Sequence, residues 1–599
     1  MCGINGVFAY KDTAPPVERE EVLRVRDSMS VRGPDGEGLW MSDDRRVGFG
    51  HRRLAIIDLN PTGAQPMTTP AGNWITFNGE IYNYKELRAE LQAKGYQFRS
   101  TSDTEVMLHL YTDRGIDMVN AMRGMYAFAL WDAKEHALWL VRDPFGIKPL
   151  YYYDDGRTVR FASQVKALLK GGPIDHAPDA AGHVGFFTWG SVPEPHTLYK
   201  AIRSVPSGTA IRFDANGRRP ENNFFNLTKE FIAAEEREHS ESVALPSEEL
   251  IREALNRSVR RHMVADVPVG VFLSSGLDSA AIAAFASVAT QEPLRSITIG
   301  CAEYKGTHSD ETPVAKLLAQ LYGCQHTERW CAKGHFVGEI ETIMEAMDQP
   351  SIDGANTFLV SREASRAGLK VALSGLGGDE TLGGYPSFSE IPRATRSLAP
   401  FARIPGLGRM VRFVVSKVPE SYASPKYAGV VEYGRDIADI YFLRRALFMP
   451  WELANVMDAD LVRAGWRELD VRGQLHAVTA GIRSDFFKIS ALEMTQYMRN
   501  QLLRDTDWAG MASSLEVRVP FLDVDFVRTV AQHFARRPLS RTQILAWIHT
   551  EELARRIASR AKTGFLIPLR KWGEDLLGNF KHTNRGLRGW ARAVHARFG

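Results

Sequence analysis

A cysteine stands at the second position of this chain, directly before Gly3. Removal of Met1 would leave its thiol beside a free α-amine, whose ordinary pKa of about 7.7 to 8.0 suits it to accept the thiol proton. A cysteine that carries its own base in this way is typical of an N-terminal nucleophile. The alternative is that Cys2 stands at this position by chance. Other segments of the chain must therefore show whether it is a nucleophile.

Three segments of the first half carry the side chains that such a nucleophile needs. Arg53 follows a predicted strand and can grip a carboxylate through two parallel hydrogen bonds. Asn78 and Gly79 follow another strand, where an amide side chain and a glycine N–H can form an oxyanion hole. Asp103 offers a carboxylate for a substrate ammonium. Each segment alone is more often a turn or a surface group.

A phosphate-binding loop is predicted in the second half. An apolar strand at residues 269–273 runs into the loop SSGLDS at residues 274–279 and then into a helix. Backbone N–H groups at a helix N-terminus form an anion cradle. The loop lacks the lysine of a Walker motif, which favours pyrophosphate binding over transfer of a terminal phosphoryl group. Asp278 would repel an anion unless a cation lay between them, so we expect Mg²⁺ here. A serine-rich turn is the alternative.

A second loop of similar character follows the predicted strand at residues 369–373. Its sequence, SGLGGDE, places Ser374 and Gly375 before the acidic residue Asp379. In an open α/β sheet, ligands bind beyond the carboxyl ends of the strands. We therefore expect the two loops to face one crevice, with Asp278 and Asp379 sharing magnesium. A plain glycine-rich turn is again the alternative.

The composition limits the class of protein that positions these residues. With 599 residues, 44% hydrophobic and 24% charged, the chain is long enough for two to four globular domains. Its 74 basic and 71 acidic residues nearly balance, so no broad footprint for nucleic acid or membrane is visible. Four cysteines are too few for a disulfide scaffold, and no signal segment is recognised. We expect a cytoplasmic protein.

The two halves of the chain differ in pattern. Residues 1–215 contain short aromatic and β-branched runs at 73–77, 126–131 and 137–141, with one helix at 84–94, which indicates stacked sheets with flanking helices. Residues 216–245 are interpreted as a linker. From Ser247, a predicted helix N-cap, strands and helices alternate, which favours a parallel sheet covered on both faces.

The end of the chain is predicted to be helical and then basic. Residues 390–580 read as largely helical, and the tail at 581–599 holds several arginines and no acid. This run of basic residues indicates either a contact with a polyanion or, more simply, a C-terminus that is solvated or loosely docked on the protein.

Taken together, these residues resemble the asparagine synthetase family, whose members join an N-terminal-nucleophile glutaminase to an ATP-pyrophosphatase-type synthetase domain. The resemblance spans nearly the whole chain. It rests on these ordered motifs: MCGI at 1–4, RGPD at 32–35, residues 51–58, NGEIYN at 78–83, RDPFG at 142–146, residues 274–279, residues 374–385, SLEVRVPFLD at 514–523, and KTGF at 562–565.

The resemblance implies an α/β fold of two domains. Residues 2–215 would form a class II glutaminase, an αββα N-terminal-nucleophile sandwich. Residues 246–580 would form a Rossmann-like parallel α/β synthetase domain with helical additions. A homodimer is expected from the family alone.

The resemblance also implies roles for the residues. Cys2 would attack the side-chain amide of glutamine, with Asn78 and Gly79 stabilising the oxyanion. Arg53 would hold the glutamine carboxylate, and Glu80 and Asp103 its ammonium. The ATP-binding residues would be Phe272, Ser274, Ser275, Gly276, Asp278, Ser279, Ile299, Ser374 and Gly375. Asp278 and Asp379 would bind Mg²⁺, and Lys562 would neutralise charge as pyrophosphate leaves.

The implied reaction converts aspartate to asparagine through an acyl-adenylate, with release of AMP and pyrophosphate. A carboxylate oxygen is a poor leaving group toward ammonia, whereas AMP departs readily. Water would hydrolyse the adenylate and a proton would inactivate the ammonia, so ammonia must travel enclosed between the sites. This requirement predicts a dry, apolar interface between the domains.

Departures from the family pattern leave the acceptor open. Leu376 stands where family members that make asparagine have an acid, and Trp508 and Gly510 stand where a basic residue and a serine are common. Ser275 replaces a frequent glycine, which is a milder change. Aspartate is one acceptor, and another carboxylate, such as a sugar acid or a biosynthetic intermediate, is the alternative. A non-catalytic regulatory homologue is a third reading.

Overall fold

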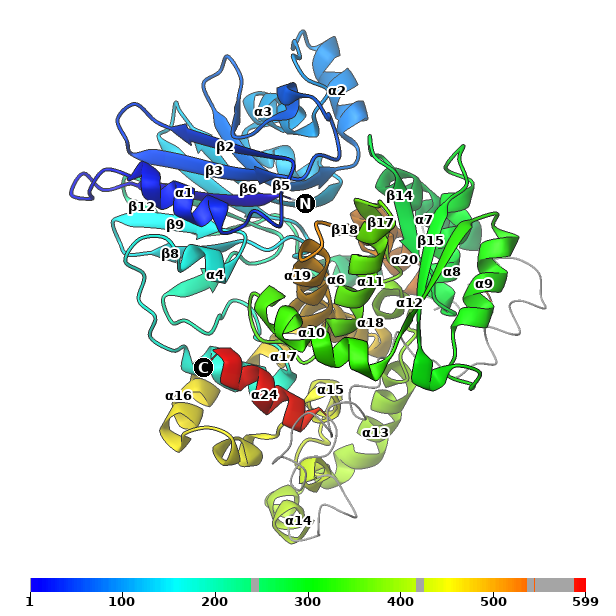
Figure 1. The fold of residues 1–599 in the computed structure, drawn as a ribbon. Helices are drawn as coiled ribbons and strands as arrows, with labels where there is room; N and C mark the ends of the chain where they lie inside the picture. The colour runs from blue at the N-terminus through cyan, green and yellow to red at the C-terminus, as the bar shows by residue number, and fades with distance from the viewer. Residues whose placement is uncertain (1, 239–246, 416–424, 536–542, 544–586, 599) are drawn as a thin grey trace.

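The computed structural model describes residues 2–238, 247–415, 425–535, 543 and 587–598. Within these residues the chain forms two α/β domains. The first contains two antiparallel sheets and the second contains one parallel sheet surrounded by helices (Figure 1).

The first domain is built on a six-stranded and a seven-stranded antiparallel sheet. In spatial order, the first sheet contains β10 (Ile202–Ser204), β8 (Tyr151–Asp154), β9 (Thr158–Ala162), β1 (Gly3–Ala9), β3 (Val47–Arg53) and β2 (Gly36–Met41). The second contains β12 (Gly217–Arg218), β11 (Thr209–Asp214), β7 (Ala137–Arg142), β6 (Gly124–Asp132), β5 (Trp74–Ile81) and β4 (Met67–Thr68), with β13 (Asn222–Asn223) paired to β11.

The two sheets pack face to face and helices cover their outer faces. Phe8 and Phe49 of the first sheet share a buried cluster with Ala129 and Leu138 of the second. Because strand side chains alternate between faces, the opposite faces remain for helices. The helices α1 (Arg19–Asp27) and α4 (Val165–Leu168) cover the first sheet, and α2 (Tyr84–Ala93) and α3 (Asp103–Arg114) cover the second (Figure 1). The layer order is the expected αββα.

Four helices of this domain are not predicted from the sequence: α1, α3, α4 and α5 (Ala180–Trp189). In α3 every residue from Asp103 to Tyr111 is buried, and in α5 every residue from Ala181 to Thr188 is buried. A helix that is buried on all sides has no polar stripe, so its sequence lacks the helical period on which the prediction depends.

The second domain contains the expected parallel sheet. Its order is β16 (Gln325–Cys331), β15 (Arg295–Cys301), β14 (Val269–Phe272), β17 (Val371–Leu373) and β18 (Glu516–Arg518). The helices α7 (Glu248–His262), α8 (Leu277–Ser287), α9 (Thr312–Leu321) and α11 (Ala355–Arg366) connect or flank these strands. Ser247 caps α7 as predicted, with its Oγ accepting from the backbone N–H of Leu250 at 3.3 Å.

The described residues from 390 to 535 are largely helical, as expected, although the short strand β18 also lies among them. The domain also contains the helices α10 (Lys333–Ala346), α12 (Gly378–Leu382), α13 (Ser387–Ala402), α14 (Leu407–Val415), α15 (Ile437–Arg445), α16 (Ala459–Leu469), α17 (Val471–Thr479), α18 (Asp485–Leu492), the π-helix η6 (Glu493–Leu503), α19 (Arg504–Met511) and α20 (Val524–Phe534). Among the helices that the structure describes, none is long and apolar enough to span a bilayer.

The expected linker at 216–245 is only partly a linker. The strands β12 and β13 extend the second sheet of the first domain to residue 223. The helix α6 (Leu227–Glu238) then packs on the second domain, where Phe231 stacks on Phe487 with 4.7 Å between the ring centroids. Strands this short and a helix of only modest amphipathicity produce little periodicity in the sequence, so the sequence does not predict them.

The basic tail docks through the helix α24 (Arg588–Phe598) on the second domain and also on α5 of the first, where His595 contacts His183 at 2.8 Å. Trp590 and Val594 are buried, and Arg588 forms an ion pair with Glu452 at 2.7 Å. This part of the tail therefore contacts protein, which favours the simpler of the two readings.

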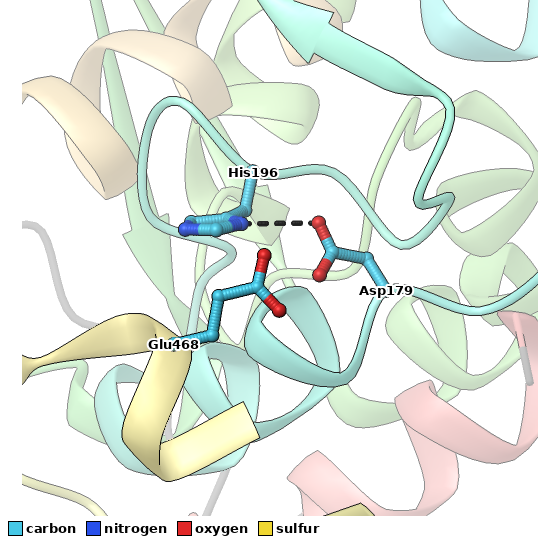
Figure 2. A group of neighbouring side chains, drawn as sticks. All are labelled: Asp179, His196 and Glu468. Carbon is cyan, nitrogen blue, oxygen red and sulfur yellow. Dashed lines mark hydrogen bonds and ion pairs between the residues drawn. The ribbon is translucent and has the colours of Figure 1, made fainter. Parts of the chain in front are cut away.

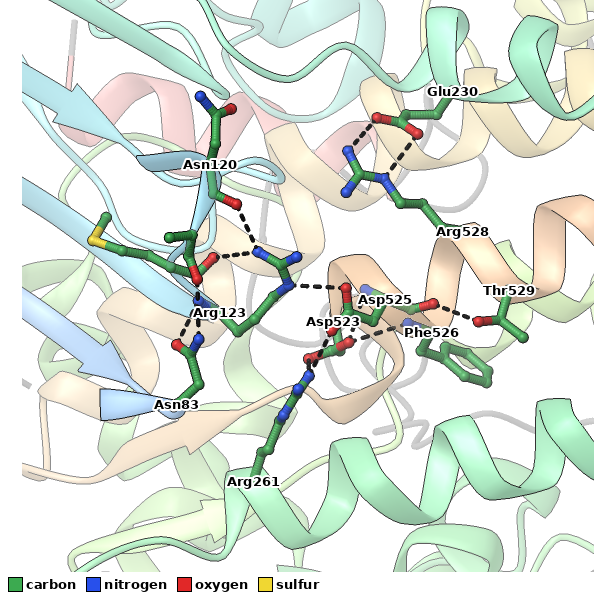
Figure 3. Close-up of polar contacts among 12 residues, drawn as sticks. Asn83, Asn120, Arg123, Glu230, Arg261, Asp523, Asp525, Phe526, Arg528 and Thr529 are labelled. Carbon is green, nitrogen blue, oxygen red and sulfur yellow. Dashed lines mark hydrogen bonds and ion pairs between the residues drawn. The ribbon is translucent and has the colours of Figure 1, made fainter. Parts of the chain in front are cut away.

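The interface between the domains is not apolar throughout, so the prediction of an apolar interface is wrong in part. Apolar residues such as Phe145 of the first domain and Leu273 of the second do share one core cluster. Charged pairs also cross the boundary, as Arg123 of the first domain contacts Asp525 of the second at 2.9 Å (Figure 3). Arg261 contacts the same Asp525 at 2.8 Å, so the carboxylate lies between two arginines (Figure 3).

Candidate active site

Five of the residues predicted for the first domain line one pocket. They are Cys2, Arg53, Gly79, Glu80 and Asp103. Cys2 lies just before β1, Arg53 ends β3, Gly79 and Glu80 lie in β5, and Asp103 begins α3. Residues that are distant in sequence therefore meet because β1 pairs with β3, β5 lies over these strands, and α3 packs against β5.

Cys2 is held by Asn78. The backbone N–H of Cys2 donates to Asn78 Oδ1 at 3.0 Å, whereas Asn78 Nδ2 is buried and has no hydrogen-bond partner among the described residues. Burial raises the pKa of the Cys2 thiol, although the backbone of Leu54 and the charge of Arg53 act in the opposite direction. The thiol is therefore protonated near neutral pH and needs a base to react.

Arg53 is fixed in the pocket by main-chain carbonyls. Its guanidinium donates to the carbonyl of Asn60 at 2.9 Å and also to that of Asp58. Gly63 permits this arrangement, because a Cβ at Gly63 would lie 2.3 Å from Arg53 Nη2. The neighbouring Arg52 points elsewhere and pairs with Asp27 at 2.6 Å.

Glu80 and Asp103 place two carboxylates in a buried environment. Burial raises the pKa of Asp103 to about 6, although the N–H of Ile81 donates to it at 3.0 Å. Burial also raises the pKa of Glu80, and the charge of Glu516 adds to the effect. Glu80 Oε2 accepts no hydrogen bond in the described part of the chain, but it forms an ion pair with Arg518 at 3.6 Å. Two buried carboxylates that line one pocket suit a cationic ligand.

Gly79 has a steric reason to be glycine. A Cβ at this position would lie 2.1 Å from the carbonyl oxygen of Met125 on the paired strand β6. Any larger residue would push β5 away from β6 and displace Asn78 and Glu80 on either side.

In the second domain the two predicted loops lie side by side. They follow β14 and β17, which are neighbouring parallel strands. A Cβ at Gly375 would lie 2.8 Å from the backbone N of Ser279, and one at Gly378 would lie 2.5 Å from Asp278 Cγ. The loops therefore touch, and glycine is required where they meet.

The first of these loops is held by its own hydroxyl groups. The backbone N–H of Ser274 donates to Ser279 Oγ at 3.1 Å, and the N–H of Gly276 donates to Ser274 Oγ at 3.1 Å. Ser275 is buried between them. This leaves the start of α8 as a compact turn that a phosphate group can approach.

The remaining predicted residues of the second domain lie close to these loops or outside the described chain. Phe272 and Ile299 pack against the same apolar cluster on adjacent strands. Asp379 lies in the first turn of α12, directly after the second loop. Lys562 lies outside the described residues.

Gln65 also lines the first pocket, although no sequence pattern predicts it. Its Oε1 accepts from the N–H of Phe77 at 2.7 Å, and its Nε2 donates to Thr104 Oγ1 at 3.1 Å. Gln65 thus ties β5 to the start of α3. It lies in an irregular segment, where a glutamine has no distinctive spacing.

In the part of the chain that the structure describes, two other groups of side chains have the character of metal ligands, but an arginine already pairs with an aspartate in each. Figure 2 shows Asp179, His196 and Glu468, where Asp179 Oδ2 accepts from His196 Nδ1 at 3.0 Å and from Arg203 at 2.5 Å. In the group of Asp436, Asp439 and His476, Arg472 pairs with Asp439 through both carboxylate oxygens. We assign neither group to a metal, because the guanidinium supplies the positive charge.

Comparison with known proteins agrees with the division of the chain into two domains. Residues 1–225 match the family model described as a glutamine amidotransferase domain, and residues 250–589 match that described as asparagine synthase. The chain is 33% identical to asparagine synthetase [glutamine-hydrolyzing] 1 of Bacillus subtilis (strain 168), over 96% of this chain and 88% of that protein. It is also 33% identical, with the same coverage, to a putative asparagine synthetase [glutamine-hydrolyzing] of Mycobacterium bovis.

A solved structure, the glutamine phosphoribosylpyrophosphate amidotransferase from B. subtilis complexed with ADP and GMP, matches over 55% of this chain and 81% of its own. The identity is 15% and the TM-score is 0.29, which is too low to carry an argument. The family models and the relatives over nearly the full length do carry one. The chain belongs to the asparagine synthetase family and is an asparagine synthetase-like amidotransferase and ligase.

Proposed function

We propose that this protein takes ammonia from glutamine at Cys2 and uses ATP to amidate a carboxylate, with aspartate as the leading acceptor. The observation that carries the proposal is the single pocket that gathers Cys2 with Arg53, Glu80 and Asp103. A reactive thiol, one fixed cation and two carboxylates match the amide, carboxylate and ammonium of glutamine.

In the proposed glutaminase step, the α-amine of Cys2 takes the thiol proton once Met1 is removed. Asn78 Oδ1 accepts from the nitrogen that would become this amine, which supports its orientation. The sulfur attacks the amide carbon, and the buried Asn78 Nδ2 is available to donate to the developing oxyanion. The α-amine returns the proton to the leaving nitrogen, so that ammonia departs and a thioester remains. Water then hydrolyses the thioester to release glutamate.

The proposed binding of the glutamine ammonium predicts a pH dependence. Since the pKa of Asp103 is raised to about 6, its carboxylate becomes neutral below that pH and loses its attraction for the ammonium. The KM for glutamine should therefore rise about tenfold per pH unit below pH 6. Steady-state glutamate release between pH 5 and 8 measures it.

Asp103→Asn is the matched variant for this prediction. It should have a high KM that no longer changes across the acidic range. A wild-type KM that stays constant down to pH 5 would contradict the role given to Asp103.

In the proposed synthetase step, the loops after β14 and β17 bind ATP, with Phe272 and Ile299 beside the base. Mg²⁺ would be held by Asp278 and Asp379 and would neutralise charge on the phosphates; hard carboxylate oxygens beside an anion cradle fit this ion. By the family resemblance, Lys562 would stabilise the departing pyrophosphate. The acceptor carboxylate attacks the α-phosphorus, pyrophosphate leaves, and ammonia then displaces AMP.

A second candidate acceptor, a carboxylate other than aspartate, is favoured by two residues. Leu376 is half-buried and packs against the apolar core, and it has no group that can take a proton from ammonia. Trp508 is 2% exposed and donates through Nε1 to Asp505 at 2.8 Å, which turns this position into an apolar wall rather than a cationic one.

Pyrophosphate release across a panel of carboxylic acids tests the acceptor. Strong stimulation by aspartate alone would establish aspartate, whereas stimulation only by a sugar acid or another acid would exclude it. Glutamate release in the same samples tests the regulatory alternative, because a non-catalytic homologue would release none.

Leu376→Glu gives a sharper test of the same question. If the wild type serves another acceptor, activity with aspartate should appear only in this variant, since a carboxylate can accept the ammonia proton. Leu376→Gln is the control, because it has nearly the same shape without the base. Equal aspartate activity in all three proteins would remove Leu376 as a determinant.

A further inference from the structure

We infer that Asp507, in the second domain, is a positioning residue for the nucleophile of the first domain and acts through Arg32. Arg32 Nε donates to the carbonyl oxygen of Cys2 at 3.2 Å. The other two nitrogens of the same guanidinium donate to the two carboxylate oxygens of Asp507 at 2.7 and 3.1 Å. The inference rests on the proposed role of Cys2.

The contact from Arg32 fixes a part of the chain that the sheet leaves unpaired. The pairing of β1 with β3 begins at Gly3, which faces Arg52, so Cys2 lies beyond the last strand pair. Its amide is held by Asn78 and its carbonyl by Arg32. Since a displacement of about 1 Å can cost about a hundredfold in rate, this second anchor bears on the direction in which the thiol points.

Arg32 depends on Asp507 for its own orientation. The side chains of Arg32 and Asp507 are 2% and 6% exposed, so neither can exchange its partner for bulk water. Burial opposes the charge of Arg32, but the carboxylate of Asp507 raises the pKa of Arg32 overall. A bidentate pair holds the guanidinium plane, and loss of one partner leaves the other charge buried without compensation.

Asp507 lies on the helix that precedes the last strand of the synthetase sheet. This helix, α19, continues into β18, which pairs with β17, the strand that leads into the second nucleotide loop. The N–H of Ser374 in that loop donates to the carbonyl of Arg518 on β18 at 2.8 Å. One rigid unit thus contacts both the proposed ATP site and, through Arg32, the carbonyl of Cys2.

The test is the kinetics of Asp507→Asn in the full-length enzyme. The kcat of glutamine hydrolysis should fall about ten- to a hundredfold while the KM for glutamine changes by less than about twofold, because Arg53, Glu80 and Asp103 are untouched. Synthesis from added ammonium chloride should stay unchanged in the same preparation. That result would also show that the second domain is folded.

Two further variants distinguish positioning from simple adhesion between domains. Asp525→Asn weakens the Arg123 contact across the same boundary (Figure 3) but has no contact with Cys2, so its glutaminase kcat should remain near that of the wild type. The exchange of Arg32→Asp with Asp507→Arg restores an ion pair but removes the donor to Cys2. Its glutaminase kcat should stay low.

The outcomes separate this inference from the proposed function. Wild-type kcat in Asp507→Asn, rescue by the charge exchange, or an equal loss of ammonia-dependent synthesis would each overturn the inference. Cys2→Ala is assayed beside them. If that variant still hydrolyses glutamine, the proposed function fails instead, because Cys2 is then not the nucleophile.

Discussion

Replacing Cys2 with alanine should lower glutamine-dependent amide formation by at least about a thousandfold, because no other group in the pocket can form the thioester. Synthesis from ammonium chloride should persist, since the loops after β14 and β17 belong to a separate domain. Glutamate release and amide formation, measured with each nitrogen source, check both halves of this prediction.

Cys324→Ala provides the control for the loss of a thiol. Cys324 is a free, half-buried cysteine of the second domain, and its replacement should leave both activities intact. If Cys2→Ala lost synthesis from ammonia as well, the two sites would not be independent and the division of labour between the domains would be wrong.

The second large effect is expected from Asp278→Asn or Asp379→Asn. Each substitution removes a negative charge proposed to hold Mg²⁺ beside the phosphates, so pyrophosphate release should fall on the order of a hundred- to a thousandfold. The loss should be equal with glutamine and with ammonia, because the activated acid is common to both. Glutamine hydrolysis should continue, which reverses the pattern expected for Cys2→Ala.

Asp458→Asn is a suitable comparison for these two variants. Asp458 caps α16 by accepting from the N–H groups of Asp460 and Leu461, and asparagine can keep that cap. This variant should retain pyrophosphate release. Full activity in Asp278→Asn and Asp379→Asn would show that the loops bind no metal needed for adenylation.

Residue types and local spacing were sufficient to predict the strands and loops that frame the site. Apolar runs at 269–273 and 126–131 form β14 and β6 because strand formation there follows local propensity and burial. The polar residues after β14 and β17 could be assigned to one edge because parallel strands end on the same side of a sheet. The αββα order was implied by the family resemblance, and the fold has it.

Helices buried on every side were not predictable in the same way. In α3, which carries Asp103, the helical period is absent because no face meets water. The sequence therefore predicts no helix at Asp103, although this residue begins a helix capped by Ser102. A stripe of exposed polar residues would have revealed this helix.

Residue types and their local order were enough to identify the chemical groups that are present and the strands and loops that carry them. Which charges meet could be known only from the folded chain, because the pairing between Arg32 and Asp507 spans 475 positions and depends on how the two domains pack. The choice of Arg53 over Arg52 was already implied by the family resemblance, and the fold gives its physical reason, since neighbouring residues of a strand point to opposite sides. The buried ion pairs at the domain interface could not be predicted for the same reason. A buried charge needs a partner of opposite charge, and no local sequence pattern shows which residue that partner is.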